Sequence, residues 1–124
     1  MKKLLIVEDE KILRKMYLER FEKQGIEVFS SDTAEGGFKI AKKEKPDLIL
    51  LDILLPKANG VSMLKNLRKD PEMSNIKVLA FSNFDDPETK KVAKELGVVD
   101  YLMKTDYTPS QITKVVEKLL KKKQ

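Results

Sequence analysis

PDLILLDILLPKANG, residues 46–60, is the stretch that decides the fold of this 124-residue chain. Four apolar residues at positions 48–51 run without a break into a single carboxylate, Asp52, and a segment containing Pro56 and Gly60 follows. A continuous apolar run of this length is typical of a strand buried on both faces, as in a parallel sheet covered by helices. Since open α/β sheets bind ligands at the carboxyl ends of their strands, the pattern places Asp52 where a ligand would lie.

Four further apolar runs predict four more short strands, at residues 2–7, 26–30, 76–81 and 98–103. Between and after them, apolar residues recur every three or four positions, which predicts five amphipathic helices. The residues predicted to face inward are Ile12, Leu13, Met16, Tyr17 and Phe21 in the first helix, Phe38, Ile40 and Ala41 in the second, Val61, Met63, Leu64 and Leu67 in the third, Val92, Ala93 and Leu96 in the fourth, and Ile112, Val115, Val116, Leu119 and Leu120 in the fifth.

Residues with known preferences for helix ends support these helices. The start signals are the capping-box pairs Asp32/Glu35 and Thr108/Gln111 and the Asp86-Pro87 cap, and the stop signals are Gly25 and Gly97. Strands that alternate regularly with helices predict one α/β domain, residues 1–124, with a doubly wound, five-stranded parallel sheet and helices on both faces.

The strand order that we expect is 2-1-3-4-5, which opens a crevice between the carboxyl ends of the first and third strands. Glu8 and Asp9 follow the first strand, and Asp52 ends the third. Three crowded carboxylates repel one another unless a cation joins them, and their hard oxygens favour Mg²⁺. Because an aspartate can attack phosphorus to form an aspartyl-phosphate, the sequence predicts phosphate chemistry at this crevice, with Asp52 as the nucleophile.

Ser82 and Lys104 follow the fourth and fifth strands and are predicted to reach the same crevice. The ammonium of Lys104 can neutralise phosphoryl charge, and the hydroxyl of Ser82 can donate a hydrogen bond to a phosphoryl oxygen. A bond that exists only in the phosphorylated state would draw Ser82 inward and let a neighbouring group fill the vacated space. The sequence therefore predicts a phosphorylation switch.

At these residues the chain resembles a response-regulator receiver domain, the phosphoaccepting part of two-component signalling, of the single-domain kind related to chemotaxis regulators. The resemblance covers essentially the whole chain. It rests on the acid pair Glu8-Asp9, on Asp52 with Pro56 and Gly60 four and eight positions later, on Ser82 after an apolar strand, on Tyr101 and on Lys104.

The resemblance implies a flavodoxin-like fold and Mg²⁺ bound by Glu8 or Asp9, by Asp52 and by the backbone carbonyl of Leu54. It also implies phosphotransfer to Asp52 from a histidine kinase or a phosphotransfer protein. Ser82 and Tyr101 would be paired switch residues, and the signalling face would be the fourth helix, the fifth strand and the fifth helix. Such a domain would not be an enzyme, because it mediates only its own phosphorylation and dephosphorylation.

Three positions depart from the family's common pattern. Thr105 stands where a cis proline is usual, so we expect either a trans bond after Lys104 or a strained cis bond. Asn83 replaces a small residue and would restrict entry to the site. Leu54 and Phe84, at the rate-tuning positions, are both apolar, and the hypothesis is that they slow hydrolysis of the aspartyl-phosphate.

Two other functions are compatible with parts of the pattern. A Mg²⁺-dependent phosphatase with an aspartyl nucleophile would carry a second aspartate two residues after Asp52, where this chain has Leu54. A binding or scaffold module could keep the fold without phosphorylation, which the departures at Asn83 and Thr105 leave open. The complete acid pair, nucleophile, hydroxyl and lysine favour the receiver over both.

Composition narrows the class of protein further. The chain has no Cys and no His, which excludes disulfides, thiolate ligands and imidazole chemistry, and its net charge is +5. The lysines of its C-terminal tail could contact nucleic acid, but we favour a solvated helix end. With no apolar stretch near the ~20 residues that span a bilayer, we expect no membrane contact, a cytoplasmic location and a monomer or weak dimer.

Overall fold

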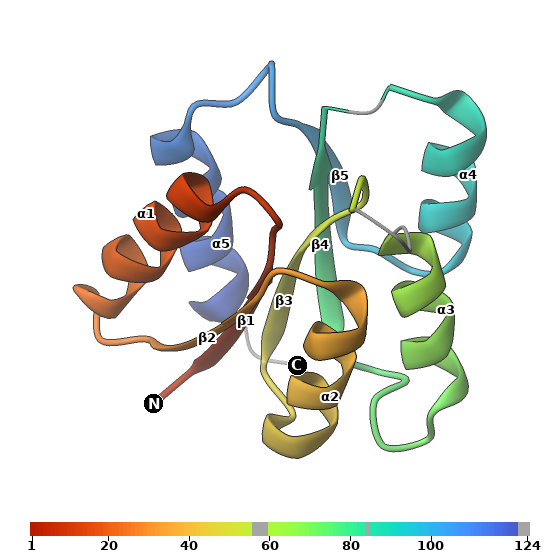
Figure 1. Ribbon diagram of the computed structural model, residues 1–124, viewed down its shortest axis with the longest axis horizontal. Coiled ribbons are helices and arrows are strands. Elements are labelled where there is room, and N and C mark those ends of the chain that lie inside the picture. Colours follow the sequence, from red (N-terminus) through yellow and green to blue (C-terminus); the bar gives the residue numbers. More distant parts are fainter. Residues whose placement is uncertain (56–59, 84, 122–124) are drawn as a thin grey trace.

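The computed structural model describes residues 1–55, 60–83 and 85–121, in which five strands alternate with five helices (Figure 1). The strands are β1 (Lys3–Val7), β2 (Glu27–Ser31), β3 (Leu48–Asp52), β4 (Lys77–Ser82) and β5 (Asp100–Met103). The helices are α1 (Lys11–Glu22), α2 (Ala34–Glu44), α3 (Gly60–Lys69), α4 (Pro87–Glu95) and α5 (Pro109–Lys121).

All neighbouring strands pair in parallel, and the order in the sheet is β2-β1-β3-β4-β5, which confirms the predicted topology. Figure 1 shows α1 and α5 on one face of the sheet and α2, α3 and α4 on the other. In the register of the sheet, Val7 lies opposite Leu51, so β1 and β3 end side by side. The residues that follow these two strands therefore meet at one edge of the sheet.

The sheet divides the interior into two apolar cores because successive strand residues point to opposite faces. In β3, Ile49 and Leu51 pack with α2, α3 and α4, whereas Leu48 and Leu50 pack with α1 and α5. All five residues of β3 are buried. This two-sided burial explains why the strand is an unbroken apolar run and why β3 lies at the centre of the sheet.

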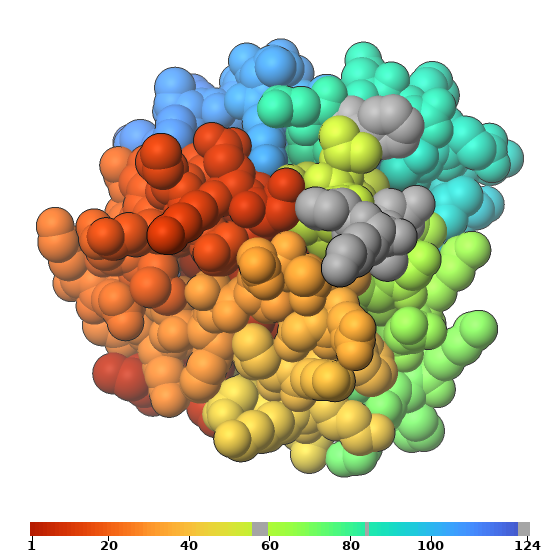
Figure 2. All heavy atoms as spheres, in the orientation of Figure 1, coloured from red at the N-terminus to blue at the C-terminus, as the bar shows by residue number. Residues whose placement is uncertain are grey.

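The edge strand β2 is less buried, and its burial pattern runs from exposed Glu27 to four partly buried residues. In the space-filling view, the red-orange and orange parts of the chain, which include α1 and α2, lie side by side on the face shown (Figure 2). Every residue of β2 thus keeps some exposure to solvent, as expected of an edge strand.

Most predicted helix signals are confirmed, and one is corrected. Asp86 accepts a hydrogen bond from the backbone N–H of Thr89 at 3.0 Å, and Thr108 and Gln111 exchange both bonds of a capping box. In α2, however, the cap is Thr33 rather than Asp32: the Oγ1 of Thr33 accepts from the N–H of Gly36. The cap thus lies one residue later than the predicted capping box.

Ile12 is a second correction, because it was predicted to face inward and is 81% exposed. Tyr17 and Phe21 form the buried face of α1 and are 1% and 0% exposed. At 3.6 residues per turn, Ile12 lies about 140° around the helix from Tyr17, which places it outside the inward stripe. A third difference is at β5, which begins at Asp100 rather than at residue 98.

Candidate functional site

Three carboxylates meet where β1 and β3 end, as the sequence predicted. Glu8 and Asp9 follow β1, and Asp52 is the last residue of β3. One carboxylate oxygen from each of the three residues lies within 4.8 Å of the others. Glu8 is fully buried and Asp52 is 3% exposed, whereas Asp9 is exposed.

The loop that carries the acid pair is held by hydrogen bonds. The Oε2 of Glu8 accepts from the backbone N–H of Glu10 at 2.9 Å. The guanidinium of Arg14, in α1, donates to the backbone carbonyls of Glu8 and Asp9 at 2.8 and 3.4 Å. Sequence reasoning missed Arg14, because a basic residue in the first turns of a helix carries no distinctive signal.

Asp52 is positioned through both of its carboxylate oxygens. Its Oδ1 accepts from the backbone N–H of Leu54 at 3.0 Å, and its Oδ2 lies 3.0 Å from the Nζ of Lys104. Gly60 packs directly behind it: a Cβ at Gly60 would lie 2.8 Å from the Asp52 carbonyl oxygen and 2.9 Å from the Cα of Ile53. Glycine at this position therefore allows α3 to approach the end of β3.

Lys104 balances the buried carboxylates. Its Nζ contacts the Oε1 of Glu8 at 2.5 Å as well as Asp52, and it lies 4.7 Å from the centre of the Phe81 ring. The backbone N–H of Lys104 donates to the carbonyl of Ser82, which ties the end of β5 to β4. One ammonium thus bridges the two acidic strand ends.

Burial dominates the electrostatics of the cluster. It raises the pKa of Glu8 to about 7, although hydrogen bonds from Lys104 and Glu10 oppose the rise. Burial likewise raises the pKa of Asp52, opposed mainly by the charge of Lys104. For Lys104, burial lowers the pKa, but its bond to Glu8 and the charge of Asp52 outweigh burial, so the pKa rises overall. The ammonium therefore stays charged, while the buried acids hold protons more tightly than exposed ones.

The cluster lines an open crevice of about 520 Å³ at the carboxyl edge of the sheet. The side chain of Leu54, 53% exposed, and Asn83 complete its rim. Both residues lie where the sequence analysis expected them to affect access. The other rate-tuning position, Phe84, lies outside the described residues, as does Pro56 of the sequence motif.

Ser82 is fully buried at the end of β4, and its side chain hydrogen-bonds that of Tyr101 in β5. Tyr101 is 8% exposed; burial raises its pKa, and the bond with Ser82 opposes this. Lys90 of α4 lies over the Tyr101 ring, 5.9 Å from its centre, and pairs with Asp85 at 2.6 Å. The two residues expected to act as a switch are thus in contact, and sequence reasoning missed the lysine that covers Tyr101.

The peptide bond between Lys104 and Thr105 is trans, which is the first of the two geometries expected there. The chain continues through a turn in which the N–H of Asp106 donates to the carbonyl of Met103. Lys104 thus reaches the carboxylates with threonine in place of the usual proline.

Comparison with known proteins identifies the family. The family model for the response regulator receiver domain matches residues 4–117. The alkaline phosphatase synthesis transcriptional regulatory protein PhoP of Bacillus subtilis is 34% identical over 121 residues, which are 98% of this chain and 49% of PhoP. Protein PilH of Pseudomonas aeruginosa is 35% identical over 104 residues, 84% of this chain and 86% of PilH. This chain therefore spans about half the length of PhoP but most of the length of PilH.

Solved structures agree with this result. Chemotaxis protein CheY4 of Vibrio cholerae superposes with a TM-score of 0.86 at 25% identity, over 97% of this chain and 99% of that one. Within the described residues, no helix has the length and apolarity to span a membrane. The match over residues 4–117, together with relatives that align over most of the chain, shows that the chain belongs to the response regulator receiver domain family.

Proposed function

We propose that residues 1–124 act as a single receiver domain that accepts a phosphoryl group on Asp52 from a histidine kinase or a phosphotransfer protein. The observation that carries the proposal is the placement of Asp52, a buried carboxylate whose two oxygens are held by the N–H of Leu54 and the ammonium of Lys104 at the rim of an open crevice. A carboxylate oxygen attacks phosphorus, and the phosphorus–nitrogen bond of the donor breaks as the new phosphorus–oxygen bond forms.

Lys104 has two roles in this proposal. Before transfer it offsets the charge of Glu8 and Asp52, which lie 2.5 and 3.0 Å from its Nζ. After transfer the Asp52 oxygen carries a phosphoryl group, and the ammonium stabilises phosphoryl charge at the same place. Its packing over the ring of Phe81 holds it in the crevice.

The carboxylate cluster fits a magnesium ion. Oxygens bound to Mg²⁺ at 2.0–2.1 Å lie about 3 to 4 Å from one another, and those of Glu8, Asp9 and Asp52 already lie within 4.8 Å. The residues that would hold the ion are these three, with the backbone carbonyl of Leu54. When bound, Mg²⁺ supplies positive charge that offsets carboxylate repulsion and phosphoryl charge.

Ser82 and Tyr101 form the proposed switch. The Ser82 hydroxyl, which contacts the Tyr101 side chain in this structure, turns to a phosphoryl oxygen once Asp52 is modified. Tyr101 then adjusts its position between β5 and the covering Lys90 of α4. Output passes through the face made by α4, β5 and α5, to a downstream protein target.

Turnover of external phosphoesters is not part of the proposal. An aspartyl-nucleophile phosphatase uses a second carboxylate two residues after the nucleophile, and this position is Leu54. We propose a domain that undergoes its own phosphorylation and dephosphorylation in the cytoplasm, as a monomer or weak dimer, with protein partners rather than nucleic acid.

Incubation with a small-molecule phosphodonor and Mg²⁺, followed by intact mass measurement, tests the proposal. The native chain should gain one phosphoryl group, and Asp52→Asn should gain none. Asp32→Asn is the matched control, since Asp32 is an exposed aspartate at the same edge of the sheet, just after β2. A modification that persists in Asp52→Asn would refute Asp52 as the acceptor.

A further inference from the structure

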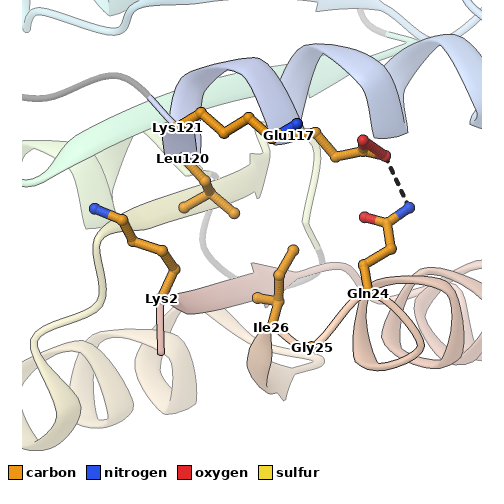
Figure 3. Close-up of a pocket in the computed structure, with 7 residues that line it drawn as sticks. All are labelled: Lys2, Gln24, Gly25, Ile26, Glu117, Leu120 and Lys121. Carbon is orange, nitrogen blue, oxygen red and sulfur yellow. Dashed lines mark hydrogen bonds between the residues drawn. The ribbon is translucent and has the colours of Figure 1, made fainter.

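A second pocket lies near the amino-terminal ends of β1 and β2, opposite the strand ends that carry the carboxylates. It has a volume of about 540 Å³ and lies between the start of β1, the turn from α1 to β2 and the end of α5 (Figure 3). The acid cluster follows the carboxyl end of β1, whereas this pocket includes Lys2, just before its first residue. No step proposed for phosphorylation uses it.

The centre of the pocket is apolar and preformed. Figure 3 shows two side chains that point toward each other: that of Ile26, the residue before β2, and that of Leu120, in α5. Both belong to the core between α1, α5 and the sheet, and Leu120 is only 5% exposed, so the core fixes their positions. Next to Ile26 the backbone turns at Gly25, with a φ of +79° and nothing within 4 Å of where a Cβ would be. Glycine at this position therefore adds no side chain to the wall of the pocket.

The rim of the pocket carries more positive than negative charge, with Lys2 and Lys121 against Glu117. Lys2 and Lys121 are exposed, and neither has a described carboxylate within 4.0 Å. The nearby carboxylate of Glu117 instead accepts a hydrogen bond from the Nε2 of Gln24 at 2.7 Å (Figure 3). Three lysines on the α2 side of the molecule differ, since Lys39, Lys42 and Lys45 pair with Glu35, Asp70 and Glu72.

A smaller hollow of about 350 Å³ extends this surface along α5. It shares Glu117 and Lys121 with the pocket and adds Lys114 and Lys118. Lys114, Lys118 and Lys121 are spaced four and three residues apart, so they form one exposed stripe on the helix. The cationic rim is therefore continuous from the pocket along the outer side of α5.

We propose that this surface docks an acidic protein segment that carries one apolar side chain. The apolar side chain enters between Ile26 and Leu120, and acidic residues on either side of it meet Lys2 and the lysine stripe of α5. Charge complementarity favours this occupant, because the rim offers ammonium groups without salt-bridge partners among the described residues. A polyanion that has no apolar side chain would leave the apolar centre of the pocket unfilled, so an acidic segment with one apolar residue fits better.

A titration followed by amide NMR tests the proposal on the whole chain. The probe is a blocked peptide of sequence EELEE, and the expected result is saturable shifts at the amides of Gly25, Ile26 and Leu120. Peptide EESEE, which lacks the apolar residue, should bind several-fold more weakly, and added salt should weaken both. Equal binding of the two peptides, or a stronger effect of an oligonucleotide of equal charge at the same amides, would overturn the proposal.

Variants separate the pocket from the general positive charge of the chain. The double variant Lys2→Gln/Lys121→Gln should bind the peptide EELEE roughly three- to ten-fold more weakly. Lys39→Gln with Lys65→Gln removes the same charge from α2 and α3 and should change little. Glu117→Gln should strengthen binding, because it removes a negative charge and keeps an oxygen that can accept from Gln24. Equal weakening by both lysine pairs would contradict a local site.

Discussion

One lysine holds two buried carboxylates in a cluster that has little solvent to stabilise its charge. Lys104 lies 2.5 Å from Glu8 and 3.0 Å from Asp52, and both acids are almost fully buried. Their raised pKa values record the cost of keeping two carboxylates charged there. A bound cation, or a modification that removes charge from Asp52, would reduce this cost.

The raised pKa of Glu8 predicts a pH dependence of stability in the absence of metal. The usual pKa of this carboxyl is 4.5, and the folded value is about 7. Between these values the folded chain holds a proton that the unfolded chain has released, so the free energy of unfolding falls as pH rises from 4.5 to 7 and levels off above 7. Glu8 should contribute about 2 kcal/mol of this fall after allowance for solvent screening.

Denaturant unfolding in EDTA at pH 5 and pH 7.5 measures this effect. In Glu8→Gln, the free energy of unfolding should fall much less between pH 5 and pH 7.5, because the glutamine side chain does not titrate. Glu35→Gln is the control, since its carboxylate is exposed on α2 and should leave the wild-type difference unchanged. A Glu8→Gln curve parallel to that of the wild type would show that Glu8 titrates normally.

Leu54 is expected to slow loss of the phosphoryl group. Its side chain is 53% exposed at the rim of the crevice, two residues after Asp52, where an apolar group neither orients nor admits an attacking water. Leu54→Asn should therefore shorten the lifetime of the phosphorylated chain several-fold, measured by intact mass over time. Leu54→Met keeps an apolar side chain and should decay like the wild type. If Leu54→Asn and the wild type lost the phosphoryl group at equal rates, Leu54 would not be what slows its loss.

In α3, one arginine adds hydrogen bonds to two neighbouring segments of the chain. Arg68 donates to the carbonyls of Ser74 and Ile76 before β4, at 3.1 and 2.8 Å, and to those of Leu96 and Gly97 after α4, at 2.6 and 3.3 Å. Burial lowers the pKa of its guanidinium. These bonds anchor the C-terminal end of α4, while Asp86 caps its other end.

Loss of this anchor should destabilise the fold. Arg68→Met leaves several partly buried carbonyls without donors and should lower the free energy of unfolding by roughly 2 kcal/mol. Arg68→Lys should recover only part of the loss, because an ammonium lacks the planar fork that reaches several acceptors. Lys65→Met, an exposed change on the same helix, should stay within about 0.5 kcal/mol in the same denaturant experiment.

For the whole molecule, a bound cation should act as a stabilising ligand. A metal that binds the folded chain alone raises its stability by mass action, so Mg²⁺ at ten times its dissociation constant should raise the melting temperature by on the order of 5 °C. The rise should vanish with EDTA and in Asp52→Asn, and it should remain in Asp32→Asn. An equal rise in all three proteins would place the ion outside the carboxylate cluster.

Much of the architecture was predictable because it depends on local patterns. The apolar run before Asp52 requires burial on two faces, and the caps at Asp86 and Thr108 involve residues only three positions apart. Ile12 was misplaced because periodicity alone does not show how wide the buried stripe of α1 is. The shift of the α2 cap to Thr33 has a similar cause, since Asp32 and Thr33 are both good caps and the loop geometry chooses between them.

By itself, the sequence determined the order of strands and helices and the residues that end each strand, because hydrophobic periodicity and helix caps act over a few residues. It also supplied the motif that marks the family. Only the tertiary structure decided that Lys104 bridges Glu8 and Asp52, that Arg14 holds the acid loop, and that Ile26 faces Leu120. These contacts join residues from different elements, and their distances depend on how the helices pack on the sheet, which local patterns do not specify.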